Sequence, residues 1–249
     1  MTLANELSQK TLNAIISRFN LTEVGDPYRT IKSQLPMAMG VPVGKMRIFK
    51  GEGFGSVSKL VYIGLTVPPI GLDSHMIFAF TDAQSAVPHF TLDSVKAGDS
   101  FAFHLDLIPR VDLGANLAYL DYAFHPLTDE YEKARKIDGL TEARLSPRQY
   151  AIMSPWMLAF RATEDAYRAV EPSIDFYLDH WAGLVESNLA RSVLASLGGV
   201  DLAERDARNR NAIFNRDVDK VWNQITPMIG NELAEEMIGV LKNQGVEEN

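Results

Sequence analysis

The sequence predicts an α+β fold in which helices cover a central antiparallel sheet. Strand-like runs follow one another between residues 45 and 109 with no helical pattern among them. One amphipathic helical pattern precedes this segment and several follow it, an order typical of a sheet covered by helices. No linker, internal repeat or low-complexity stretch divides the chain, so we expect a single domain over residues 1–249.

The composition is that of an ordinary folded protein and excludes several classes of function. Hydrophobic residues make up 46% and charged residues 22% of the chain. A net charge of −8 argues against nucleic acid or an anionic membrane as a partner. Cysteine is absent, which excludes disulfides, cysteine-ligated zinc and cysteine-bound iron–sulfur clusters. With neither a secretory signal nor an apolar run long enough for a membrane span, we expect a cytoplasmic protein.

The first elements are a helix, a connection and two strands. Apolar residues recur at helical spacing up to Asn20, which predicts an amphipathic helix, and the proline-rich stretch 21–44 reads as a connection. Strand-like runs at 45–50 and 58–65 then flank the glycine-rich sequence GEGFGSV. A dinucleotide fingerprint requires glycine where Ser56 stands, and a helix afterwards, so we expect no bound nucleotide cofactor.

The next strand is predicted at 75–80, with His75 as its first residue, and a hairpin follows at 87–110. A two-residue loop at 97–98 sets Asp93 opposite Ala102. Because side chains alternate along strands, this register collects polar residues on one face. They are His89, Thr91, Asp93, His104 and Asp106. The polar face is either exposed to solvent, as in many antiparallel sheets, or a functional site.

Helical patterns dominate after residue 110 and carry further candidate residues. A long pattern runs from Pro172 to Leu197, and another runs from Asp201 through Phe214 to Pro227. On this second helix Asp217 borders the apolar stripe, where a carboxylate either forms a salt bridge or faces a cavity. The preceding arginines are either solvated or available to an anionic group on a substrate. They are Arg205, Arg208 and Arg210.

A metal site is not expected. His104 and Asp106 share a strand face with His89, but no further pattern specifies a coordination geometry. A serine-hydrolase site is also excluded, since the sequence lacks the G-x-S-x-G motif.

The order and spacing of several segments resemble red chlorophyll catabolite reductase and, more distantly, the ferredoxin-dependent bilin reductases. These segments are VPHFTLD at 87–93, FHLDLIPRVD at 103–112, the helix start at 116–122, the run from 204 to 217, and a looser match at 154–161. The resemblance implies a three-layer α/β/α sandwich that holds a linear tetrapyrrole between the sheet and the C-terminal helices. It also implies a reductase without a bound cofactor, in which ferredoxin delivers single electrons and acidic side chains supply protons. An acidic ferredoxin requires a local basic patch.

The resemblance also assigns residues. Asp93 matches the acidic residue of the central strand, and Asp217 matches the acidic residue of the C-terminal helix; both are expected to be catalytic. His75 matches a catalytic histidine of one bilin-reductase branch, but its spacing to Asp93 differs by one residue, which reverses its face unless the loop absorbs the difference. The expected substrate contacts are His104, Arg161 and Arg210.

The sequence therefore leads to the hypothesis of a ferredoxin-dependent reductase acting on a biliverdin-type bilin. One alternative is reduction of red chlorophyll catabolite itself. The other is a tetrapyrrole-binding carrier or sensor that performs no reduction.

Overall fold

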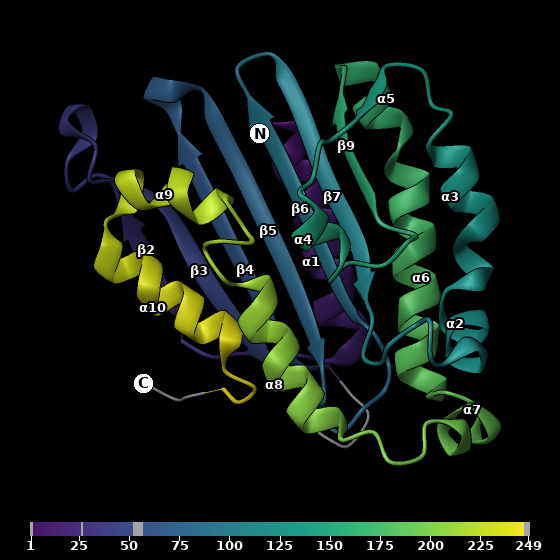
Figure 1. Cartoon of the computed structure of the whole chain (residues 1–249). Coiled ribbons are helices and arrows are strands. Elements are labelled where there is room, and N and C mark those ends of the chain that lie inside the picture. The colour runs from purple at the N-terminus through teal and green to yellow at the C-terminus, as the bar shows by residue number, and fades with distance from the viewer. Residues whose placement is uncertain (1, 26, 52–56, 247–249) are drawn as a thin grey trace.

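The computed structural model describes residues 2–25, 27–51 and 57–246, and these residues form a nine-stranded antiparallel sheet (Figure 1). The strand order is β1-β3-β4-β5-β6-β7-β9-β8, and β2 pairs with β3. The strands are β1 (Thr22–Glu23), β2 (Arg29–Lys32), β3 (Pro42–Lys50), β4 (Val57–Val67), β5 (Leu72–Thr81), β6 (His89–Ala97), β7 (Ser100–Ile108), β8 (Leu140–Glu142) and β9 (Leu158–Ala162). The predicted glycine-rich loop, with Ser56, lies largely outside the described residues.

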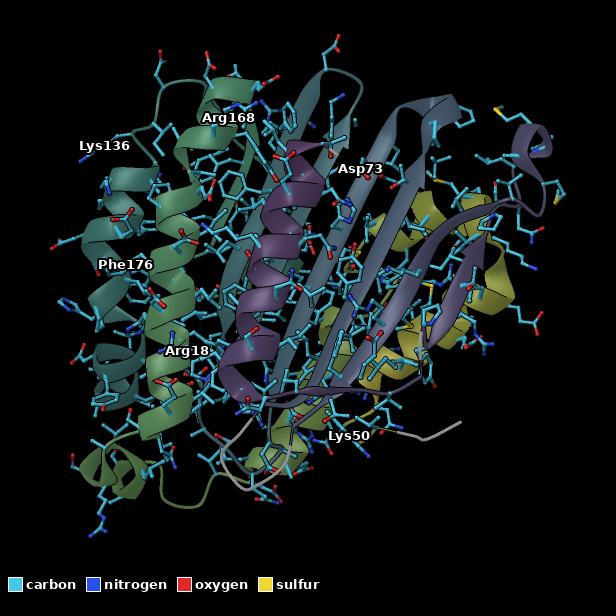
Figure 2. All side chains as sticks on the ribbon, turned by 180° about the vertical axis from the view of Figure 1, so that it is seen from behind. Arg18, Lys50, Asp73, Lys136, Arg168 and Phe176 are labelled. Carbon is cyan, nitrogen blue, oxygen red and sulfur yellow. The ribbon has the colours of Figure 1, made fainter. Side chains whose placement is uncertain are left out.

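Helices cover both faces of the sheet. They are α1 (Leu3–Phe19), α2 (Leu117–Ala123), α3 (Thr128–Ala134), α4 (Pro147–Tyr150), α5 (Glu164–Ala169), α6 (Glu171–Ser187), α7 (Arg191–Ser196), α8 (Leu202–Ile213), α9 (Val221–Ile229) and α10 (Asn231–Lys242), with 3-10 turns at Pro36–Ala38, Pro68–Ile70 and His125–Leu127. One face lies under α8, α9 and α10 (Figure 1), and the other lies under α1 and α6 (Figure 2). The α+β sandwich with a central antiparallel sheet is therefore confirmed. No helix in the described part of the chain is long and apolar enough to cross a membrane.

The hairpin of β6 and β7 has the predicted faces but a different register. The turn consists of Gly98 and Asp99, one residue later than expected, and Gly98 has φ +60°, which suits the first position of a type II′ turn. Asp93 consequently lies opposite His104 instead of Ala102. Moving the turn by one residue moves the pairing by two, so every side chain keeps its predicted face.

The helix predicted around Asp217 is interrupted. In the structure α8 ends at Ile213 and α9 begins at Val221, and Asp217 lies in the turn between them. The Asn215 side chain accepts a hydrogen bond from the backbone N–H of Asp217 at 2.8 Å, and Asp219 accepts one from the N–H of Val221 at 3.1 Å. Such side-chain bonds offer the backbone an alternative to the helix, and they end it here.

A buried ionic cluster joins α8 to the sheet. The Asp206 carboxylate accepts a hydrogen bond from Arg210 at 2.8 Å, contacts His89 at 2.6 Å and lies 3.5 Å from the guanidinium of Arg110. Burial, together with the charge of Arg110, lowers the pKa of His89 to about 3, so His89 is neutral and donates to the carboxylate. Asp206 is thus the carboxylate that balances two buried guanidinium groups.

Replacing this carboxylate is expected to destabilise the fold strongly. Asp206→Asn preserves the shape of the side chain but leaves both guanidinium groups buried without a counter-charge, which costs about 3–5 kcal/mol of unfolding free energy. Urea denaturation at pH 7 measures the loss. The control is Glu204→Gln on the same helix, where an exposed ion pair with Arg208 contributes less than about 1 kcal/mol. Equal losses in the two variants would contradict a structural role for the cluster.

Candidate functional site

A cavity of about 140 Å³ lies between the sheet and the turn that connects α8 to α9. Its floor is formed by β5, β6 and β7, and its cover by the chain around α4 and the α8–α9 turn (Figure 1). Most of the lining is apolar, from Met76, Phe78, Ile108, Leu145, Met153, Ile213, Phe214 and Val218. The polar lining residues are Thr91, Asp93, His104, Gln149 and Asp219. We call this space the Asp93 cavity.

Asp93 and His104 form a pair on the floor of the cavity. They lie opposite each other on β6 and β7, with 3.5 Å between Asp93 Oδ2 and His104 Nδ1. Three buried polar atoms here have no hydrogen-bond partner among the described residues. They are Asp93 Oδ1, His104 Nε2 and Thr91 Oγ1. Buried polar atoms are nearly always paired, so unpartnered atoms in a cavity indicate a place for a ligand.

The environment of His104 favours its protonated form. Burial disfavours a charged imidazole, but Asp93 outweighs that cost, assisted by the charges of Asp106 and Asp219, and the pKa of His104 is raised. The imidazole therefore holds a proton to a higher pH than an ordinary histidine.

Asp219 faces this pair from the opposite wall. Burial, together with the negative charge of Asp93, raises its pKa to about 6, against the opposing effect of the hydrogen bond from the Val221 N–H. A carboxyl group with this pKa keeps its proton close to neutral pH, as a general acid must. The cavity therefore combines two proton-holding groups, His104 and Asp219, around one carboxylate, Asp93.

The structure brings Asp219, and not the predicted Asp217, to the cavity. Asp217 is exposed to solvent and does not line the cavity, whereas Asp219 does. A continuous helix would have turned Asp219 away from the apolar stripe. Asn215 carried the available signal, because an asparagine side chain readily accepts a hydrogen bond from the backbone N–H two residues on and so favours a turn.

His75 lies on the opposite side of the sheet from Asp93. Met76 is the residue paired with Asp93, so its neighbour His75 points to the face under α1. There its imidazole contacts Asp73 at 3.0 Å and Tyr62 at 2.8 Å, beside Asn5 of α1. The expectation that His75 assists Asp93 is therefore corrected: the loop does not absorb the one-residue difference in spacing.

The two arginines expected at the substrate lie elsewhere. Arg210 is fully buried, paired with Asp206, and its guanidinium carbon lies 3.9 Å from the ring centroid of Phe80. It does not line the Asp93 cavity and is corrected to a structural residue. Arg161 is exposed on β9, two residues from the strand partner of His104, and does not line the cavity either.

The other polar residues of the hairpin support the site indirectly. Asp106 is fully buried and accepts hydrogen bonds from the backbone N–H of Ser154 at 3.0 Å and from its hydroxyl at 2.5 Å. These bonds fix the chain after α4, which contributes Met153 to the cavity wall. Among the described residues, no three His, Cys, Asp or Glu side chains lie together as metal ligands do.

The raised pKa of Asp219 predicts a specific change in stability with pH. The folded protein keeps this proton up to about pH 6, whereas the unfolded chain releases it near pH 3.8, so the contribution to stability falls as pH rises through this window. Asp219→Asn removes this fall. The unfolding free energy of the variant minus that of the wild type should therefore increase by up to about 3 kcal/mol from pH 4 to pH 7, as measured by urea denaturation. Asp217→Asn is the control, and a wild-type pH dependence in Asp219→Asn would contradict the assignment.

Comparison with known proteins identifies the fold. No family model matches the sequence, and no curated protein matches it. Among solved structures, selenomethionine phytochromobilin synthase from tomato, crystallised in complex with biliverdin, is similar with a TM-score of 0.73 and 16% identity. The match covers 98% of this chain and 84% of the tomato chain. The chain therefore has the fold of phytochromobilin synthase, which confirms the fold implied by its resemblance to the bilin reductases.

Proposed function

We propose that this protein reduces a linear tetrapyrrole of the biliverdin type, with electrons from reduced ferredoxin and protons from its own side chains. The observation that carries the proposal is the convergence of Asp93, His104 and Asp219 on one cavity with otherwise apolar walls. An apolar wall suits a conjugated pigment, and the three polar groups suit its nitrogen and oxygen atoms. Phytochromobilin synthase, which has the same fold, binds biliverdin in its crystal structure.

The proposed reaction adds two electrons and two protons to the pigment. Reduced ferredoxin supplies the electrons one at a time, and each is followed by a proton. Asp93, with the proton held by His104 at 3.5 Å, delivers one of them to the reduced pyrrole system. Asp219 takes the role expected of Asp217, and donates the other proton or orients the ring carbonyls.

A cationic segment supports ferredoxin as the electron donor. Residues 27–50 include five lysines and arginines and no acidic residue, although the whole chain carries a net charge of −8, and Arg29 and Arg47 of this segment are paired with Glu236 and Glu23. Lys32 and Lys45 are exposed on β2 and β3 at this edge of the sheet. Since β3 lies three strands from β6, about 14 Å separates this edge from Asp93. Positive charge here would steer an acidic donor towards the site.

Asp93→Asn tests the proposed proton delivery. The amide has nearly the same shape, so the variant should still bind biliverdin, seen as a shift in visible absorbance. It does not deliver the proton, so we expect turnover to fall at least about 100-fold and a pigment radical to accumulate in electron paramagnetic resonance. Wild-type turnover in this variant would exclude Asp93 as a proton donor.

A matched pair of variants tests the second acid. Asp219→Asn should lower turnover at least about 100-fold, whereas Asp217→Asn, an exposed change two residues away, should stay within about twofold of wild type. Both are assayed with biliverdin under reducing, anaerobic conditions. The reverse order of effects would return the catalytic role to Asp217.

The same assay separates the alternatives for the whole protein. Anaerobic incubation with biliverdin, ferredoxin and a reducing system changes the spectrum of the pigment if the protein is a reductase. A carrier or sensor binds the pigment and leaves its spectrum stable. Red chlorophyll catabolite in a parallel reaction determines which of the two tetrapyrroles is the substrate.

A further inference from the structure

A larger cavity adjoins the Asp93 cavity beside the N-terminal half of α8. Its volume is about 670 Å³. We call it the α8 groove, and its lining includes Pro109, Ile152, Met153, Arg205, Arg208 and Asn209. None of the catalytic roles proposed above uses this groove.

The two cavities adjoin each other along three elements. At their boundary, three elements each line both spaces. The end of β7 contributes Ile108 to the Asp93 cavity and Pro109 to the groove. The turn after α4 contributes Met153 to the cavity and Ile152 to the groove, and α8 contributes Ile213 to the cavity and Asn209 to the groove. Asn209 and Ile213 are four residues apart and therefore lie on one face of α8. The groove thus follows directly from the cavity.

Met153 lines both spaces and divides them. Methionine is unbranched and turns about three side-chain bonds, so it moves more easily than other apolar residues. The backbone beside it is fixed, because Ser154 donates two hydrogen bonds to the buried Asp106. A rotation of the Met153 side chain would therefore join the two spaces without moving the backbone.

Ligand size requires such a connection. Cavities that enclose drug-sized ligands measure about 300–1,000 Å³, and the Asp93 cavity, at about 140 Å³, is smaller than this range. We propose that the α8 groove is the second half of the ligand site: an elongated apolar ligand displaces Met153, fills both spaces and places a carboxylate against Arg205. The proposal rests on the function proposed above and extends it to the carboxylate side chains of the pigment.

Arg205 is a cation of the groove whose guanidinium group has an unused hydrogen-bond donor. It lies on the same face of α8 as Asn209 and Ile213, about 12 Å along the helix from Ile213. Its Nε is buried and has no hydrogen-bond partner among the described residues. A guanidinium group binds a carboxylate through two parallel hydrogen bonds, which suits the acidic end of a ligand.

Each carboxylate that lines the groove has a hydrogen bond or an ion pair with a residue other than Arg205. Asp201 accepts a hydrogen bond from the Glu204 N–H at 2.9 Å, and Asp112 accepts one from the Ala115 N–H at 2.7 Å. The Glu204 carboxylate is paired with Arg208. Among the described residues, none of these carboxylates forms an ion pair with Arg205, so its guanidinium group is available to a ligand.

The test compares biliverdin with its dimethyl ester, in which both carboxylates are neutral. Absorbance titrations without ferredoxin give the Kd of each pigment for the wild type, Arg205→Gln and Met153→Trp. Arg168→Gln is the matched control, because this arginine lies on α5 on the other side of the sheet and is paired with Glu164 (Figure 2). Arg205→Gln should raise the Kd of biliverdin about tenfold and that of the ester less than twofold. Arg168→Gln should change neither.

The Met153 variants test the connection between the two spaces. Met153→Trp should raise the Kd of both pigments at least about tenfold, because the larger and more rigid indole side chain cannot rotate aside to join the two cavities. If it impairs folding, Met153→Ala replaces it and should speed association of both pigments. Equal effects of Arg205→Gln on acid and ester, or Met153 variants that bind like wild type, would overturn the inference and leave the proposed function standing. A wild-type protein that binds no biliverdin would instead overturn the proposed function.

Discussion

The ionic cluster around Asp206 is the interaction on which the Asp93 cavity and the α8 groove depend, because it attaches α8 to the sheet. The buried residues of α8 are Asp206, Arg210 and Ile213, so this helix is held mainly by charged groups and only in part by an apolar stripe. The hydrogen bond between His89 of β6 and Asp206 at 2.6 Å is directional and, with the Arg110 guanidinium 3.5 Å from the same carboxylate, it fixes the rotation of α8 about its own axis. That rotation turns Arg205 towards the groove and starts the turn that brings Asp219 over the sheet.

Asp93 favours the protonated forms of both neighbouring groups. Its negative charge raises the pKa of His104 against the effect of burial, whereas at Asp219 burial is the main cause of the raised pKa and the charge of Asp93 adds to it. His104 and Asp219 also interact with each other, so a proton lost from one of them changes the proton affinity of the other.

The sequence predicted those features of the site that follow from local rules. Alternation along β6 and β7 places Asp93 and His104 on one face whatever the turn, because moving a hairpin turn by one residue shifts the pairing by two. The same alternation separates His75 from Asp93, as the one-residue difference in spacing indicated. Asp219 was missed because helical periodicity was extended through a segment where Asn215 ends the helix. Arg210 was misplaced because its cationic character does not tell which carboxylate it meets.

By itself, the sequence determined the antiparallel strands between residues 45 and 109, the helices that precede and follow them and the polar face of the hairpin, since all of these depend on patterns between near neighbours in the chain. The short strands β1, β2, β8 and β9 were not predicted. Only the tertiary structure decided that this face meets Asp219, that Asp206 meets His89 and Arg110 across the fold, and that Met153 separates two cavities. These contacts join residues distant in sequence, and their geometry depends on how α8 and the turn after α4 are placed against the sheet. No local pattern encodes that placement.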